Sequence, residues 1–143
     1  MTSIADLIAT GRTRSLEFFP PRSEEAERQF HIAVGELVGL APSFASVTYG
    51  ALGTTRESTR ELVVGMNADH PFPTMAHLTC VGHTHAEIVA LLDDYSRRGV
   101  RNILALGGDP PADGSPPGGD FAHAIELVEL IRAHPGGFCV GGA

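Results

Sequence analysis

The sequence is poor in cysteine, in basic residues and in long hydrophobic runs, and each scarcity excludes a class of protein. Its two cysteines, Cys80 and Cys139, lie in separate apolar runs, so we predict two reduced core thiols and no disulfide scaffold. Ten basic residues against 17 acidic ones give a net charge of -7, which disfavours nucleic-acid binding. No run approaches the ~20 apolar residues of a membrane span, and the N-terminus lacks an export signal. We therefore expect a cytoplasmic protein with neither a membrane nor a nucleic acid as its partner.

What the sequence does contain is a repeated alternation of apolar runs and helix-like segments. Five near-continuously apolar runs predict strands, at residues 15–19, 44–49, 74–81, 101–107 and 138–141. Apolar residues at helical spacing predict helices at residues 3–10, 23–40, 54–66, 84–99 and 120–134. Apolar strands separated by single helices pair in parallel, with the helices outside. The pattern predicts one α/β domain, either a doubly wound sheet or a (β/α) barrel.

Glu17 is the first candidate functional residue, because both folds bind their ligands at the carboxyl ends of the strands. It lies in the first expected strand, three residues before the double proline at 20–21. A carboxylate buried there would be costly unless it were protonated or paired. Glu17 is therefore either an acid suited to proton transfer or the ion-pair partner of an arginine such as Arg56 or Arg101.

Asp109 is the second candidate acid. It stands between two glycines, Gly107 and Gly108, and the double proline at 110–111, so the backbone is constrained on both sides. It is either a site residue or a turn-capping aspartate. The loop that it opens, residues 107–120, holds five glycines and four prolines and is longer than an ordinary strand-to-helix turn. Such a loop is either functional or a solvated insertion.

Other polar residues near strand ends have both a functional and a structural interpretation. A lone histidine on an apolar strand, such as His77, is more often a core residue than a ligand. Thr48 offers a hydroxyl to a ligand but also simply suits a strand. His83 and His85 flank an expected helix start, where capping and exposure to solvent explain them, so we predict no metal site. The residues alone predict an α/β ligand site with two acids.

Four motifs, in this order and at these intervals, resemble the methylenetetrahydrofolate reductase family. They are EFFPP (17–21), SVTYGALGTTR (46–56), HLTCVGHT (77–84) and RNILALGGDPP (101–111). The resemblance runs from about residue 15 to residue 140, and it implies a (β/α)₈ TIM barrel. It also implies an oxidoreductase of one-carbon metabolism and methionine biosynthesis. Members reduce 5,10-methylenetetrahydrofolate to 5-methyltetrahydrofolate with NAD(P)H, usually through bound FAD.

The resemblance also assigns roles to individual residues. It implies that Glu17 is the general acid that helps to open the folate ring, and that Asp109 contacts the pterin near the flavin. The cofactor-binding positions that it implies are Thr48, His77, Leu106, Gly108, Asp109 and Ala122, with the glycines after Thr48 allowing a close approach. Gly107 departs from the arginine common in the family, so direct hydride transfer from NADH without flavin remains an alternative.

The length of the chain limits what the resemblance can cover. A barrel typically needs ~250 residues, so we expect residues 1–143 to form about the first half of a single barrel domain, from a longer protein. Half a barrel exposes strand edges and an uncovered interior, so we expect homo-oligomers. The alternative function is that of a catalytically incomplete half-barrel fragment that binds flavin or a partner chain.

Overall fold

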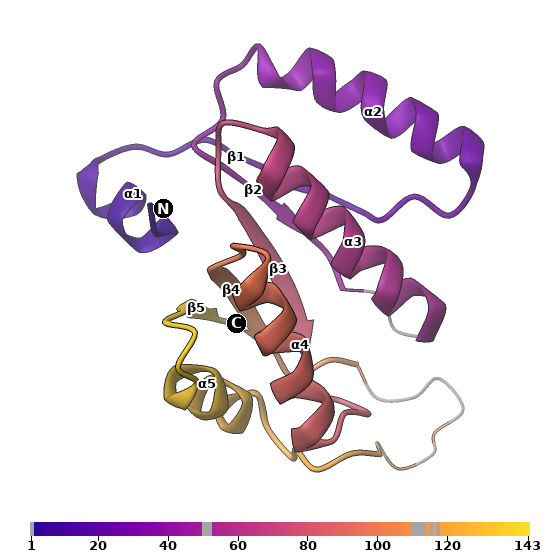
Figure 1. Ribbon diagram of the computed structural model, residues 1–143, viewed down its shortest axis with the longest axis vertical. Coiled ribbons are helices and arrows are strands. Elements are labelled where there is room, and N and C mark those ends of the chain that lie inside the picture. The colour runs from indigo at the N-terminus through magenta and orange to yellow at the C-terminus, as the bar shows by residue number, and fades with distance from the viewer. Residues whose placement is uncertain (1, 50–52, 110–113, 115, 117) are drawn as a thin grey trace.

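The computed structural model of the chain describes residues 2–49, 53–109, 114, 116 and 118–143. The strands are β1 (Ser15–Phe18), β2 (Phe44–Val47), β3 (Thr74–Thr79), β4 (Asn102–Leu106) and β5 (Cys139–Gly142). The helices are α1 (Ile4–Thr10), α2 (Glu24–Val38), α3 (Gly53–Asp69), α4 (His85–Arg97) and α5 (Ala124–Ala133) (Figure 1). Every strand and helix predicted from the sequence is confirmed. Gly50 and the double proline at 110–111 lie outside the described residues.

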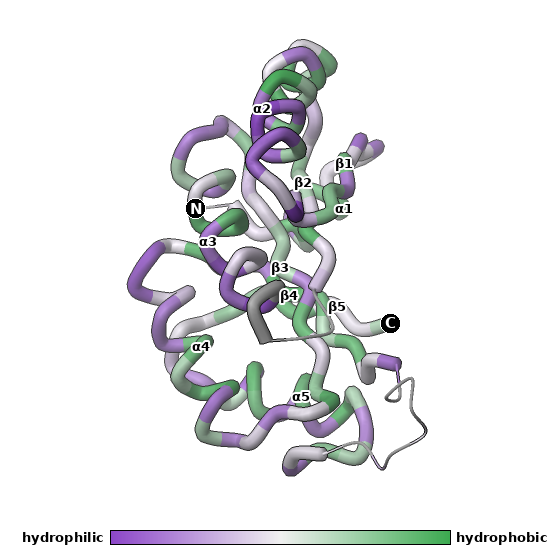
Figure 2. Tube along the Cα trace, turned by 90° about the vertical axis from the view of Figure 1, so that its right-hand side faces the viewer, coloured by the Kyte–Doolittle hydropathy of each residue, from purple (hydrophilic) through white to green (hydrophobic). Residues whose placement is uncertain are grey.

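The order of the strands decides between the two folds that the sequence allows. The five strands form one sheet in the order β1-β2-β3-β4-β5, and all neighbours are parallel. A doubly wound sheet contains a point at which the strand order reverses, and this sheet has none. Helices α3 and α4 lie together on one side of the strands (Figure 2). Sequential parallel strands with helices on one face form the wall of a (β/α) barrel, which confirms the predicted fold class.

The helices begin where the sequence provides capping side chains. The Ser23 hydroxyl accepts the Ala26 N–H at the start of α2, and Thr84 forms a capping box with Glu87 at the start of α4. Helix α1 packs at the amino end of β4, where the buried N–H of Ile4 donates to Asn102 Oδ1 at 2.9 Å. Within the described part of the chain, the helices are too short or too polar to cross a bilayer.

The hydrophobic core lies between the sheet and helices α3–α5. Its fully buried side chains come from alternate positions of the central strands and from the facing helices, and include Val47, Ala76, Leu78, Ile103, Val63, Ile88, Leu92, Tyr95 and Leu127. Since side chains alternate along a strand, the intervening residues point to the other side of the sheet. We call this the inner face. Its register aligns Glu17, Ser46, Met75 and Asn102 across four strands.

Strand β1 is less buried than its apolar sequence predicts. Its four residues alternate between exposed and half-buried, and Phe19 beyond its end is 75% exposed. β1 lies at the edge of the sheet. The helix beside it, α2, has a single buried residue, Val34. The prediction of a buried first strand was therefore wrong, because an edge strand is covered from fewer sides. Of the two free thiols, Cys80 is a core residue as predicted, whereas Cys139 is only half-buried.

Candidate functional site

Glu17 and His77 meet on the inner face, although they are sixty residues apart in the sequence. Ser46 Oγ donates a hydrogen bond to Glu17 Oε2 at 3.2 Å, and His77 Nε2 lies 3.4 Å from the same oxygen. The Glu17 side chain is 55% exposed, so the prediction of a buried acid is corrected. Its partner is His77 and neither of the arginines considered, because the parallel register brings β1, β2 and β3 side by side.

His77 is the buried member of this pair. It is 8% exposed, and burial lowers the pKa of its ring while the nearby Glu17 carboxylate opposes that shift. Nε2 has no hydrogen-bond partner among the described residues, because the 3.4 Å contact with Glu17 is not aligned as a hydrogen bond. A buried polar atom without a partner is costly. His77 therefore has one nitrogen available for a ligand on the inner face.

Thr48 and Leu106 extend the inner face toward the carboxyl ends of the strands, which we call the carboxyl edge. The N–H of Thr48 donates to the Phe18 carbonyl at 3.0 Å, so the backbone pairing with β1 continues past the end of β2. Thr48 follows Ser46 by two residues and shares its side of the sheet. Leu106 pairs in register with Thr79, two residues after His77, and is half-buried. Three of the predicted cofactor positions thus share one surface.

Two adjacent glycines continue the site beyond β4 and differ in their surroundings. Gly108 has φ +88°, and a Cβ there would lie 2.4 Å from Val81 Cγ1, so the position requires glycine. A Cβ at Gly107 would meet nothing within 4 Å. Asp109 follows as an exposed residue at the carboxyl edge. Ala122, also exposed, lies just before α5, where its N–H donates to Glu126 Oε2 at 2.6 Å.

The sequence did not predict the pair formed by Tyr49 and His83. Tyr49 Oη lies 2.8 Å from His83 Nε2, and His83 is only 6% exposed, so its predicted exposure to solvent was wrong. Thr84 caps the helix, while His83 turns into the protein. Burial raises the pKa of Tyr49 to about 12, and burial together with Arg56 lowers the pKa of His83. The available signal was Tyr49 itself, since a tyrosine directly after an apolar strand needs a partner for its hydroxyl.

The described end of the long loop is anchored rather than free. The Gly82 N–H donates to the Gly118 carbonyl, and the Asp120 N–H donates to the His83 carbonyl, both at 2.8 Å. Asp120 also accepts the His85 N–H at 2.8 Å. This end of the loop is therefore part of the carboxyl edge. Across the described residues, no three His, Cys, Asp or Glu side chains lie close enough together to hold a metal ion.

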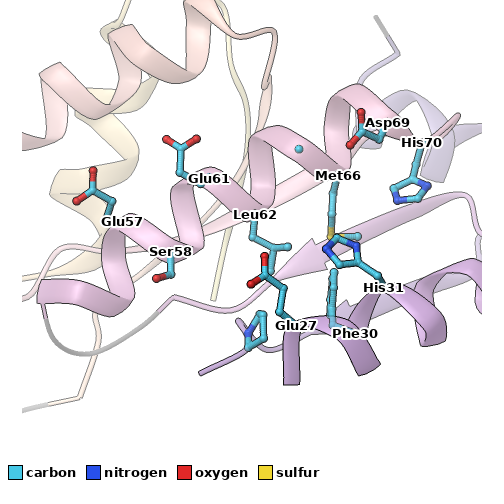
Figure 3. A pocket seen from close by; sticks show the side chains of 12 residues that line it. Glu27, Phe30, His31, Glu57, Ser58, Glu61, Leu62, Met66, Asp69 and His70 are labelled. Atoms are coloured by element: carbon cyan, nitrogen blue, oxygen red, sulfur yellow. The ribbon is translucent and has the colours of Figure 1, made fainter. Parts of the chain in front are cut away.

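A cavity of about 450 Å³ lies elsewhere, between α2 and α3. Figure 3 shows Leu62 and Met66 of α3 pointing toward Phe30 and His31 of α2, whereas Glu61 points away. None of the predicted site residues lines this cavity. It therefore reflects the loose packing of α2 on the helix side of the sheet and is separate from the inner face.

Comparisons with known proteins identify the family of the chain. The sequence model of the family described as methylenetetrahydrofolate reductase matches residues 3–143. The 5,10-methylenetetrahydrofolate reductase of Salmonella typhimurium is 38% identical over 119 residues, which cover 82% of this chain and 39% of the relative. Methylenetetrahydrofolate reductase (NADH) 1 of Zea mays is 36% identical over 139 residues, covering 94% of this chain and 23% of the relative.

The chain thus spans about two fifths of the length of the bacterial relative and under a quarter of the plant one. The match nevertheless extends from α1 through β5, and it includes every predicted site residue. The chain belongs to the methylenetetrahydrofolate reductase family.

Proposed function

We propose that this chain forms the part of an active site that reduces 5,10-methylenetetrahydrofolate to 5-methyltetrahydrofolate with NAD(P)H. The contact between Glu17 and His77 at 3.4 Å carries the proposal, because it places an acid beside a neutral polar ring on the inner face. The name of the Zea mays relative, which specifies NADH, supports NADH as the co-substrate. The free thiol of buried Cys80 supports a reducing, cytoplasmic location.

The residues of the inner face fit a bound flavin. Thr48, His77 and Leu106 lie on one surface, and His77 Nε2 is a buried polar atom without a hydrogen-bond partner among the described residues. Gly108 and Asp109 continue this surface beyond β4, and Ala122 would close it from the start of α5. These six residues would hold FAD. A bound flavin supplies hydride transfer, which none of the twenty side chains performs alone.

In this proposal Glu17 supplies the proton that ring opening of the folate needs. The Ser46 hydroxyl, 3.2 Å from Oε2, holds the carboxyl group in one orientation. Because burial lowers the pKa of His77, the ring beside Glu17 is neutral at pH 7. A flat ligand on the inner face would exclude water from Glu17 and from the folate ring that it faces. Asp109 would accept hydrogen bonds from the pterin at the carboxyl edge.

A second candidate function is a half-barrel that binds flavin or a partner chain without catalysis. It is favoured by the exposure of the inner face, where Glu17 is 55% exposed, and by the 75% exposure of Phe19. Such a face would also promote homo-oligomers.

Oxidation of NADH that depends on added methylenetetrahydrofolate separates the two functions. The proposed function predicts turnover by the complete barrel, which Glu17→Gln lowers by about 10²- to 10⁴-fold. Binding of FAD or formation of oligomers in size-exclusion chromatography, with no turnover of folate, would instead support the half-barrel that only binds.

A further inference from the structure

His83 links three segments of the carboxyl edge, although the resemblance to the family gave this residue no role. Its side chain contacts Tyr49, which follows β2, at 2.8 Å. Its backbone carbonyl accepts the N–H of Asp120, at the far end of the loop that follows β4. The residue itself lies just after β3, where its own N–H donates to the Cys80 carbonyl at 3.2 Å.

The end of the loop fits closely against the backbone of His83. Gly119 has φ +99°, and a Cβ there would lie 2.4 Å from the His83 carbonyl oxygen and 2.6 Å from its nitrogen. Only glycine allows this approach. The Gly82 N–H adds a second hydrogen bond to the same segment, through the Gly118 carbonyl. The loop end, which runs beside the start of α4 (Figure 1), is therefore positioned by the two residues 82 and 83.

The surroundings of His83 favour one tautomer. Nδ1 has no hydrogen-bond partner among the described residues, but it lies 3.6 Å from Glu87 Oε2, whose negative charge favours the proton on Nδ1. We therefore assign Nε2 as the acceptor for the Tyr49 hydroxyl. This arrangement needs a neutral histidine and a protonated tyrosine. Burial provides both states, and the Arg56 guanidinium, 5.9 Å from the centre of the Tyr49 ring, also disfavours a charged His83.

We propose that His83 is a positioning residue. By accepting the hydrogen bond of Tyr49, it fixes the Gly118–Asp120 end of the loop against the ends of β2 and β3. Tyr49 adjoins Thr48, and the Val81 N–H, two residues before His83, donates to the Gly107 carbonyl at 3.2 Å, so His83 sets the spacing between the proposed cofactor contacts at Thr48 and Gly108. The anchoring of the loop stands by itself, whereas the effect on the cofactor rests on the proposed function.

Hydrogen exchange at the Asp120 and Gly82 amides tests the anchoring without any assay of activity. Tyr49→Phe removes the donor and His83→Phe removes the acceptor while keeping an aromatic ring. We expect each variant to speed exchange of both amides by about three- to tenfold, the effect of losing one net hydrogen bond. The double variant should exchange no faster than either single one, because both changes break the same bond. His83→Gln, whose side-chain oxygen can accept from Tyr49, should restore most of the protection.

The matched control is His31→Phe, the same change at an exposed residue of α2. It should leave both amides at the wild-type rate. The proposal is overturned if Tyr49→Phe leaves exchange unchanged, or if His83→Gln loosens the loop as much as His83→Phe does. Either result would show that the backbone contacts hold the loop without the side chain.

Titration with FAD, followed by flavin fluorescence, tests the link to the site. His83→Phe should weaken FAD binding by about three- to tenfold relative to wild type, and His83→Gln and His31→Phe should not. Faster exchange with unchanged FAD affinity would overturn the link to the cofactor while leaving the anchor in place. If the wild-type protein does not bind FAD at all, the flavin part of the proposed function fails, and the exchange measurements still decide the role of His83.

Discussion

The centre of the sheet and its first edge follow the same strand-helix pattern, but they are packed to very different degrees. In β2–β4 the side chains that face the helices, such as Val47, Leu78 and Ile103, are completely buried. In β1 the residues alternate between exposed and half-buried, and Val34 is the single buried residue of α2. The difference teaches that an apolar pattern decides where a strand runs, whereas burial depends on what lies on each side of it. The proposed site combines both regions, since Glu17 comes from the edge and His77 from the centre.

The largest effect that we expect comes from the edge and concerns activity alone. Glu17→Gln should lower the reduction of folate by about 10²- to 10⁴-fold, because a general acid contributes about this much to a rate. Its effect on stability should stay within about 0.5 kcal/mol, as for other exposed positions. Steady-state kinetics and urea unfolding measure the two quantities.

If the protein binds flavin, NADH oxidation by an artificial electron acceptor is the control for this variant, because that reaction needs no proton donor for folate. It should continue at the wild-type rate. Equal loss of both activities would show that Glu17 stabilises the edge strand and has no specific part in folate reduction. The contrast between a packed centre and a functional edge would then be wrong.

A pair of leucines tests the difference in packing directly. Leu78→Ala, at a fully buried position of β3, should lower the free energy of unfolding by about 2 to 5 kcal/mol. Leu40→Ala, at a residue after α2 that is 49% exposed, is the matched control and should cost less than about 1 kcal/mol. Urea unfolding compares the two variants. Similar costs would mean that the α2 region is as well packed in solution as the centre.

Gly107 tests whether the open part of the carboxyl edge can gain a contact with the cofactor. A side chain there meets no atom within 4 Å of its Cβ, so Gly107→Arg should fold normally. A charge-assisted hydrogen bond contributes about 1.5 to 3 kcal/mol, which corresponds to about one to two decades of affinity. We expect the wild-type protein to purify with little flavin and the variant to retain more, as measured by visible absorbance. Stoichiometric flavin in the wild type would show that the backbone contacts suffice.

The adjacent glycine should respond in the opposite way. Gly108→Ala would place a Cβ 2.4 Å from Val81 Cγ1 at φ +88°, so we expect a loss of about 1 to 3 kcal/mol in the free energy of unfolding. Gly107→Ala is the control and should change it by less than about 0.5 kcal/mol. Thermal or urea unfolding checks both. Equal stability of the two variants would mean that the loop shifts without cost and that Gly108 is not fixed against β3.

The smallest effect concerns pH and the two buried histidines. Burial lowers the pKa of His77 and of His83 below the ordinary value of 6.5, so the unfolded chain binds more protons than the folded one just below that value. The stability that depends on these neutral rings is therefore complete above pH 6.5 and is lost as the pH falls through the lowered values. Urea unfolding between pH 7 and pH 5 should show this decline.

Variants of single histidines assign the decline to its source. His83→Gln should make the dependence on pH shallower, because one titrating ring is removed, whereas His31→Gln, at an exposed position, should leave the slope unchanged. If substitution of the buried histidines leaves the slope of stability against pH unchanged, the pH dependence of stability comes from the carboxylates. Those of Glu87, Asp120 and Glu126 have lowered pKa values because they accept backbone hydrogen bonds, so they act at more acidic pH.

Local patterns in the sequence were sufficient to predict the elements of the fold. Each strand is a short apolar run, and each helix has apolar residues at helical spacing; α2 and α4 also have capping residues at their starts, Ser23 and Thr84. These signals depend on residues close together in the sequence, so they can be recognised without knowledge of the rest of the molecule. The motifs around Glu17, Thr48, His77 and Asp109 likewise indicated the family, which the match over residues 3–143 confirmed.

The tertiary structure decided what surrounds those residues. Only the parallel register brings Glu17 to His77, and only the position of β1 at the edge of the sheet leaves Glu17 exposed. Only the tertiary structure buries His83, which local sequence assigned to solvent, against Tyr49 and the loop end at Gly119. The physical reason is that periodicity and capping depend on neighbours in the chain, whereas burial, pKa and partner choice depend on neighbours in space.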